Sequence, residues 1–142
     1  MYLVFEQLSI GMRKLLSGLV GVNDADKPEI VATRVDRQSQ LKKGLKAEHP
    51  VIRTHPVTGR QLVYVNRAHT THFVGMTELE SSPILAHLFE LTIRPENTCR
   101  FHWQPGSLAF WDNRACQHYP LNDYNGEFRH MLRISLAGDK PY

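Results

Sequence analysis

The feature that most constrains the fold is an alternation of side chains along residues 128–137, near the end of the chain. Successive side chains of a β-strand point to opposite faces of the sheet, so residues two apart share a face. One face would consist of His130, Leu132, Ile134 and Leu136. The other would carry Arg129, Met131, Arg133 and Ser135. The alternation predicts a strand whose first face packs against the protein.

The two arginines of the second face, Arg129 and Arg133, allow two interpretations. They lie on a solvated outer surface, or they line a pocket in which guanidinium groups bind carboxylate, sulfonate or phosphate through paired hydrogen bonds. The second interpretation predicts an anionic ligand. The strand pattern leaves both open.

Further β-prone runs predict that the chain is mainly β after residue 49. Residues 50–55 and 60–66 flank the sequence Pro56-Val57-Thr58-Gly59, which predicts a hairpin. Later strands are expected at residues 98–103, at residues 108–111 and around His118. These short strands favour a β-sandwich or barrel with added helices.

Two helices are predicted from apolar spacing and capping residues. The first has Met12, Leu15, Leu16 and Leu19 on one face, with Ser9 as a cap and Gly21 as an end. The second lies near residues 78–94, with Thr77 or Ser81 as its cap. We expect one domain over residues 1–142, helical or irregular over 1–48, with a long polar loop or irregular helical segment at 23–48, and β-rich over 49–142.

The composition is that of a globular protein and excludes several classes. Of the 142 residues, 42% are hydrophobic, and the formal charge of +3 is too small to predict a nucleic-acid partner. Two cysteines do not make a disulfide framework, and neither a signal peptide nor a membrane span is evident. The expectation is a cytoplasmic protein without a membrane partner.

Eight histidines are unusual for so short a chain, and the residues allow two patterns of metal or nucleophile chemistry. A zinc site could be written from Cys99, His102, Cys116 and His118. Cys99 and His102 are three residues apart, so on one strand they would point to opposite faces. Cys116 with His118 as its base would be a nucleophile, although no oxyanion loop is evident. An isolated histidine such as His118 is more often structural than a ligand.

Three runs carry a resemblance to a known family: HPVIRTHPVTGRQLVYVN (49–66), FHWQPGSLAFWDNRACQHYPLNDY (101–124) and FRHMLRISLAGDKPY (128–142). They resemble the C-terminal half of the TauD/TfdA (taurine dioxygenase) family of Fe(II)- and 2-oxoglutarate-dependent dioxygenases. The resemblance implies part of a double-stranded β-helix, a jelly-roll barrel that holds iron on two histidines and one carboxylate.

The resemblance also implies roles for individual residues. His118 matches the second histidine of the iron site, and Arg129 matches the arginine that binds 2-oxoglutarate. Arg133 matches the arginine that binds the substrate's anionic group, and Trp111 matches a tryptophan near the iron. His69 stands where taurine-type members carry an aromatic substrate-pocket residue, a departure that argues against taurine itself. The implied substrate is a small anionic compound such as a sulfonate or sulfate ester.

The implied reaction is hydroxylation of that substrate with O2 while 2-oxoglutarate is decarboxylated to succinate. The first two iron ligands of the family form a His-x-Asp pair, and none of the eight histidines here begins such a motif. We therefore expect a truncated dioxygenase that has no turnover by itself and that forms homo-oligomers through exposed strand edges. The alternative is a catalytically inactive remnant that acts at most as a binding or assembly module.

Overall fold

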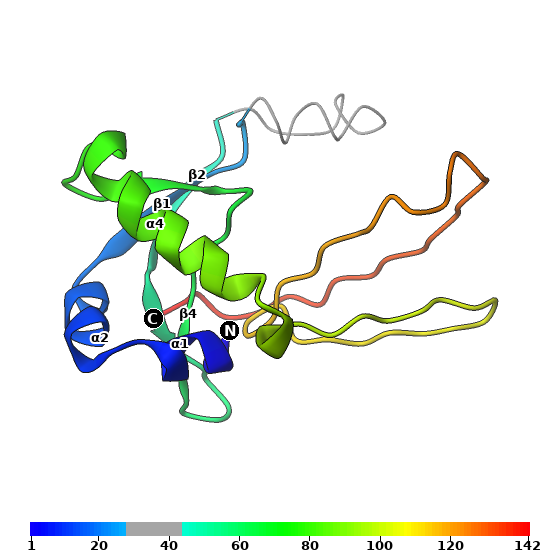
Figure 1. Ribbon diagram of the computed structural model, residues 1–142, viewed down its shortest axis with the longest axis horizontal. Coiled ribbons are helices and arrows are strands. Elements are labelled where there is room, and N and C mark those ends of the chain that lie inside the picture. Colours follow the sequence, from blue (N-terminus) through cyan, green and yellow to red (C-terminus); the bar gives the residue numbers. More distant parts are fainter. Residues whose placement is uncertain (28–43) are drawn as a thin grey trace.

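A three-stranded antiparallel sheet is the central element of the computed structural model, which describes residues 1–27 and 44–142 (Figure 1). β1 (Val20–Asp24) lies between β2 (Lys46–Pro50) and β5 (Thr70–Phe73). In β1, Gly21 faces His49 of β2 and Phe73 of β5. The expectation of a loop or irregular helical segment over 23–48 is therefore wrong at both ends, where strands form. Its middle, residues 28–43, lies outside the described residues.

Gly21 does not end a helix, contrary to the sequence prediction. It is buried in β1, where an added Cβ would come within 3.3 Å of Thr70 Cγ2 on the neighbouring strand. Any larger residue here would have to displace the Thr70 side chain by a few tenths of an ångström, so the close approach of the two strands favours glycine.

The predicted hairpin is confirmed. β3 (Ile52–Thr54) pairs antiparallel with β4 (Gln61–Val63), with Ile52 opposite Val63. Gly59 in the connecting turn has a φ of 70°, a left-handed conformation that glycine adopts without steric cost.

The two predicted helices also form, with sharper boundaries. After α1 (Tyr2–Gln7), α2 (Ile10–Ser17) begins at Ser9, whose Oγ accepts a hydrogen bond from the Met12 N–H at 3.2 Å. α4 (Glu78–Thr92) begins at Thr77, which forms a reciprocal capping box with Glu80, and the short helix η1 (Pro95–Asn97) follows it. Thr77 rather than Ser81 is the cap, because the buried Ser81 hydroxyl lies inside the helix and donates to the Thr77 carbonyl.

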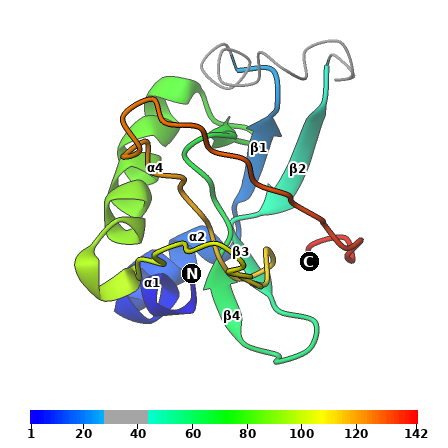
Figure 2. The same cartoon turned by 90° about the vertical axis from the view of Figure 1, so that its right-hand side faces the viewer.

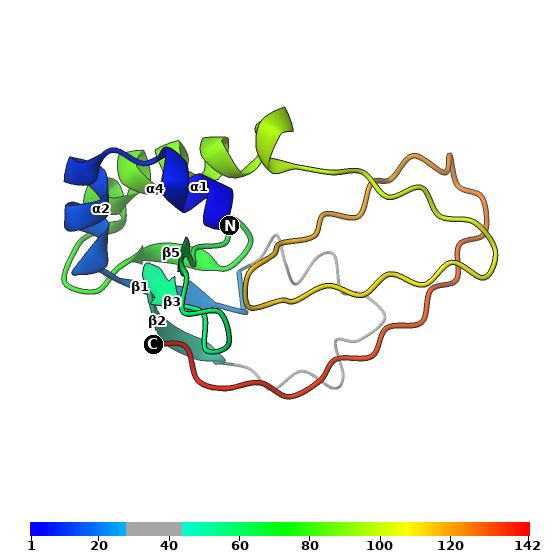
Figure 3. The ribbon, with the colours of Figure 1, turned by 90° about the horizontal axis from the view of Figure 1, so that it is seen from below.

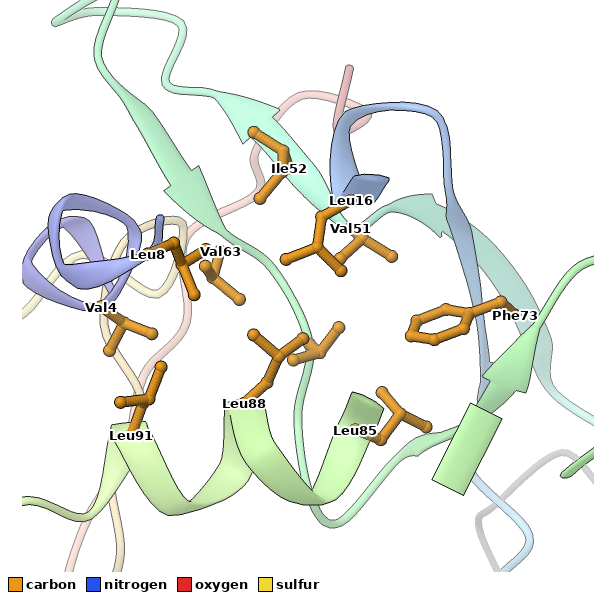
Figure 4. Packing of buried hydrophobic residues seen from close by; sticks show 11 residues of the cluster. Val4, Leu8, Leu16, Val51, Ile52, Val63, Phe73, Leu85, Leu88 and Leu91 are labelled. Carbon is orange, nitrogen blue, oxygen red and sulfur yellow. The ribbon is translucent and has the colours of Figure 1, made fainter. Parts of the chain in front are cut away.

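The helices lie on one side of the strands (Figures 2 and 3). The hydrophobic core lies between these two layers. Apolar side chains from α1, α2 and α4 meet those of β3, β4 and β5 (Figure 4). The best buried of them are Val4, Leu16, Val51, Val63, Val65, Phe73 and Leu88, each at most 1% exposed. Burial of these side chains is the main source of stability in this body.

The C-terminal third extends away from this body as two arms (Figures 1 and 3). We call residues 98–111 the first arm and residues 117–138 the second arm; the turn 112–116 joins them. In the described structure neither arm contains a strand, so the strands predicted at 98–103, 108–111, around His118 and at 128–137 do not form. Strands require hydrogen-bonding partners, and no ladder of the described residues includes these segments.

The predicted packing face of the second arm is consequently exposed. Leu132, Ile134 and Leu136 are each at least 80% exposed. Large apolar side chains of the first arm, Leu108 and Phe110, are exposed to a similar degree. The observed fold is thus a helix-covered β body with extended arms, and no closed barrel is present in the described ranges. None of the helices described is long and apolar enough to cross a bilayer.

Candidate functional site

Asp112 organises the turn 112–116, which joins the two arms. The Asp112 carbonyl accepts hydrogen bonds from the N–H groups of Ala115 and Cys116, at 3.0 and 2.9 Å. Its side-chain Oδ1 accepts the Arg114 N–H at 2.8 Å. A short aspartate side chain is suited to such local bonding, which fixes the backbone between the two arms.

A two-point ion pair reinforces this turn. Arg114 Nε donates to Asp112 Oδ1 at 2.9 Å and Arg114 Nη2 donates to Asp112 Oδ2 at 2.8 Å. The hydrogen bonds from Arg114 are the largest cause of a pKa of Asp112 well below its usual range, with a smaller contribution from His55. The carboxylate is therefore ionised at neutral pH and holds a positive partner.

His55 attaches this turn to the body. Its Nδ1 accepts hydrogen bonds from the N–H groups of Val57 and Thr58, both at 3.2 Å, so the ring proton belongs on Nε2. Nε2 then donates to Asp112 Oδ2 at 3.0 Å, and the imidazole is only 4% exposed. The buried histidine thus joins the β3–β4 hairpin to the segment that precedes His118. The sequence reasoning missed this pair, which spans 57 residues along the chain.

His118, the residue matched to an iron ligand, begins the second arm and is exposed. Its ring lies 5.1 Å from the ring of Trp111, centroid to centroid. Trp111 Nε1 donates to Asn113 Oδ1 at 2.8 Å. The structure therefore brings His118 and Trp111 together across the turn that Asp112 fixes.

The two arginines of the second arm, Arg129 and Arg133, are exposed. The Arg129 guanidinium lies over the Tyr124 ring, 5.8 Å from its centre. Among the described residues, no hydrogen bond or ion pair joins either arginine to His118.

His69 is half-buried and lines a cavity of about 390 Å³ between the sheet and the turn 112–116. Asn66, Tyr64 and Gln117 line the same cavity, and the Gln117 amide donates to the Val65 carbonyl. His118, Arg129 and Arg133 are not part of its lining. His69 therefore lies in a pocket whose lining includes Gln117, the residue before His118.

The described residues do not assemble an iron site. Within 1–27 and 44–142, no three histidine, cysteine, aspartate or glutamate side chains converge as metal ligands. His118 alone does not fit the two-histidine, one-carboxylate set of the implied iron centre. The four residues of the zinc interpretation do not converge in the described structure either. Cys99 and Cys116 are both exposed free thiols.

Comparisons with known proteins all point to one group of enzymes. The family model described as "Taurine catabolism dioxygenase TauD, TfdA family" matches residues 1–135. The chain is 34% identical over 149 residues to an alpha-ketoglutarate-dependent sulfate ester dioxygenase of Pseudomonas putida, covering 96% of this chain and 48% of that protein. It is 30% identical over 141 residues to an alpha-ketoglutarate-dependent sulfonate dioxygenase of Saccharomyces cerevisiae, covering 96% of this chain and 34% of that protein.

A solved structure gives the same result for the fold. The crystal structure of a taurine dioxygenase from Burkholderia xenovorans is 38% identical, with a TM-score of 0.66 over 80% of this chain and 36% of that one. This chain therefore spans less than half the length of each of these three proteins.

Proposed function

Because the chain belongs to the TauD/TfdA family of dioxygenases, we propose that it forms the C-terminal part of an Fe(II)- and 2-oxoglutarate-dependent dioxygenase for a small anionic substrate. The observation that carries the proposal is the family match over residues 1–135, which contains His118, Arg129 and Arg133. Two relatives, a sulfate ester dioxygenase and a sulfonate dioxygenase, support an anionic substrate. Alpha-ketoglutarate in those names is 2-oxoglutarate.

Each residue then has a role that its chemistry suits. The His118 imidazole would bind iron through a neutral ring nitrogen. The guanidinium of Arg129 would hold the far carboxylate of 2-oxoglutarate, and that of Arg133 would hold the substrate's sulfonate or sulfate by paired hydrogen bonds. Trp111 and His69 would contact the substrate side of the site. Iron, when bound, supplies the O2 chemistry.

The remaining iron ligands would come from residues other than these 142, as part of the same jelly-roll barrel. In that arrangement residues 128–137 are a barrel strand, and their exposed row of Leu132, Ile134 and Leu136 packs against the protein layer outside the lumen. Arg129 and Arg133 would then face the site from the opposite side of the strand.

The test compares two proteins. The purified 142-residue chain should release no succinate from 2-oxoglutarate with Fe(II) and ascorbate, since none of its histidines begins a His-x-Asp motif and its residues 1–27 and 44–142 assemble no ligand set. A longer polypeptide with a His-x-Asp motif in frame before Met1 should release succinate in the presence of an alkyl sulfate or a sulfonate. His118→Ala and Arg129→Ala in that polypeptide should abolish release, whereas Arg133→Ala should mainly raise the KM for the anionic substrate.

Two results would contradict this function. Succinate release by the 142-residue chain alone would exclude the need for further ligands. Undiminished release by His118→Ala in the longer polypeptide would remove His118 from the site. A stop codon in place of the in-frame motif would favour the inactive remnant.

We also propose that the isolated chain associates with itself through the arms. Apolar side chains with at least 80% exposure occur on both arms, and exposed apolar rows with unpaired backbone groups favour association. Light scattering of the purified chain should give a mass above 16.3 kDa, and Leu132→Lys with Ile134→Lys should return it to the monomer. A monomer at high concentration would contradict this proposal.

A further inference from the structure

Arg53 in β3 is a buried charge for which the described residues supply no acid. Its side chain is 1% exposed, yet Nε and Nη2 have no hydrogen-bond partner. No aspartate or glutamate of the described residues lies within ion-pair distance of it. Arginine remains protonated at any ordinary pH, so it cannot relieve the cost of burial by losing its proton.

Tyr64 provides only part of the stabilisation that the buried charge of Arg53 needs. The guanidinium carbon of Arg53 lies 4.7 Å from the centre of the Tyr64 ring, a cation–π contact. The ring lies over the guanidinium group, whereas the N–H bonds of Nε and Nη2 lie in the guanidinium plane. Nε and Nη2, which form one edge of the guanidinium group, therefore still need a hydrogen-bond acceptor.

The neighbourhood of Arg53 is positive and polar. The His49 ring packs edge-on against the same Tyr64 ring, with centroids 5.6 Å apart, and its buried Nδ1 also has no partner. Burial lowers the pKa of His49, and the charges of Arg53 and Lys140 lower it further. His49 and Tyr64, two of the three residues of this cluster, line the cavity of about 390 Å³, and Arg53 lies behind them, outside its lining.

A second arginine of this protein shows what the unpartnered edge can hold. Arg114 uses the same two atoms, Nε and Nη2, to bind both oxygens of the Asp112 carboxylate at 2.9 and 2.8 Å. Nε and Nη2 are the pair whose N–H bonds run parallel and match the spacing of carboxylate oxygens. Arg53 presents this edge from a buried position, beside an imidazole that can add a hydrogen bond.

We propose that Arg53, with His49 and Tyr64, forms a carboxylate-binding site behind the β3–β4 hairpin. The site is separate from the roles proposed for Arg129 and Arg133, which lie on the second arm. A small carboxylic acid in solution and the aspartate or glutamate side chain of a second copy of this chain would offer the same two oxygens. The proposal does not depend on the dioxygenase reaction, and its test measures no turnover.

The test uses the purified 142-residue chain with acetate as the probe and chloride at matched ionic strength as the reference. At a tenfold excess over its Kd, acetate should raise the thermal midpoint by roughly 5 °C. It should also raise the pKa of His49, followed by NMR, because the carboxylate offsets the charge of Arg53. Arg53→Gln should remove both responses, whereas Arg67→Gln, a surface control on an arginine whose side chain is 68% exposed, should keep them.

The outcomes separate the two sources of the carboxylate. A saturable acetate response at low protein concentration supports a small acid. A rise in the pKa of His49 with protein concentration, in the absence of acetate and removed by Arg53→Gln, supports an acidic side chain of a second copy. If neither acetate nor protein concentration changes the pKa of His49 in the wild-type chain, the site does not exist. This last measurement needs no variant and so does not depend on how Arg53→Gln folds.

Discussion

The body and the two arms have similar β-prone sequences but different structures. Residues 52–54 and 61–63 form a paired hairpin that packs against α1 and α2. Residues 128–137 alternate more regularly than either of these segments, yet they remain extended and exposed. The difference shows that alternation specifies which face of a segment can pack, whereas a strand also needs a neighbour for its backbone groups and a layer over its apolar face.

The largest effect that tests this comparison is loss of a leucine from the core. Leu88 of α4 is 0% exposed, so Leu88→Ala should lower the free energy of unfolding by about 2–5 kcal/mol. The matched variant Leu132→Ala, in the second arm at 88% exposure, should change it by less than about 0.5 kcal/mol. Urea denaturation followed by circular dichroism measures both. Similar losses in the two variants would show that the arm packs in solution.

The next effect concerns the link between the regions. His55→Ala should cost about 2 kcal/mol, because it removes a buried hydrogen bond to the ionised Asp112. His87→Ala, at an exposed position of α4, is the control and should be close to neutral. The fluorescence of Trp111 should also change in His55→Ala, since the turn beside it would lose its attachment. An unchanged urea midpoint would show that the arms hold their position without His55.

A smaller effect is expected within the body at the start of α4. Thr77→Ala removes the capping box with Glu80 and should cost about 1 kcal/mol. Ser82→Ala, an exposed position in the same helix, should not be destabilising. Thermal melts of the two variants side by side would settle the point, and equal midpoints would mean that the packing of α4 alone defines its first turn.

The smallest effect is a dependence of stability on pH. The pKa of Asp112 is lower in the folded chain than in the unfolded one, so its contribution is complete above its ordinary pKa of about 3.9. That contribution should be lost progressively as the pH falls below about 4. Its size is modest, because the Asp112 side chain is 38% exposed and water screens the pair. Asp112→Asn should flatten the acid limb of stability against pH, whereas Asp123→Asn on the second arm should not.

The sequence predicts local elements well when their cause is local. Ser9 caps α2 as predicted, and Thr77, one of the two candidates, caps α4. The turn 56–59 joins the two strands that flank it. β1 was missed because its residues, VGVND, carry weak β signals, and its pairing with β2 and β5 is made across distant parts of the chain. The prediction of strands in the arms was wrong for the opposite reason. Their alternating pattern is strong, but no pairing strand is present among the described residues.

The candidate site divides in the same way. His118, Arg129 and Arg133 were identified through resemblance to a family, and their roles remain predictions. The pair of His55 and Asp112 depends on a contact between residues 57 positions apart, so no local pattern could reveal it. The unpartnered edge of Arg53 was equally hidden, because a single arginine in a β-prone run gives no sign of burial.

The free thiols provide natural positions for chemical labels. Cys99 lies at the beginning of the first arm and Cys116 lies in the turn that His55 attaches to the body, and both are exposed. The chain has no other cysteine, so a spin or fluorescent label can be placed at each by replacing only the other. One labelled position would report on a segment without ladder partners, and the other on a segment held by hydrogen bonds. Motion of the arms could then be followed relative to the body as partners or ligands are added.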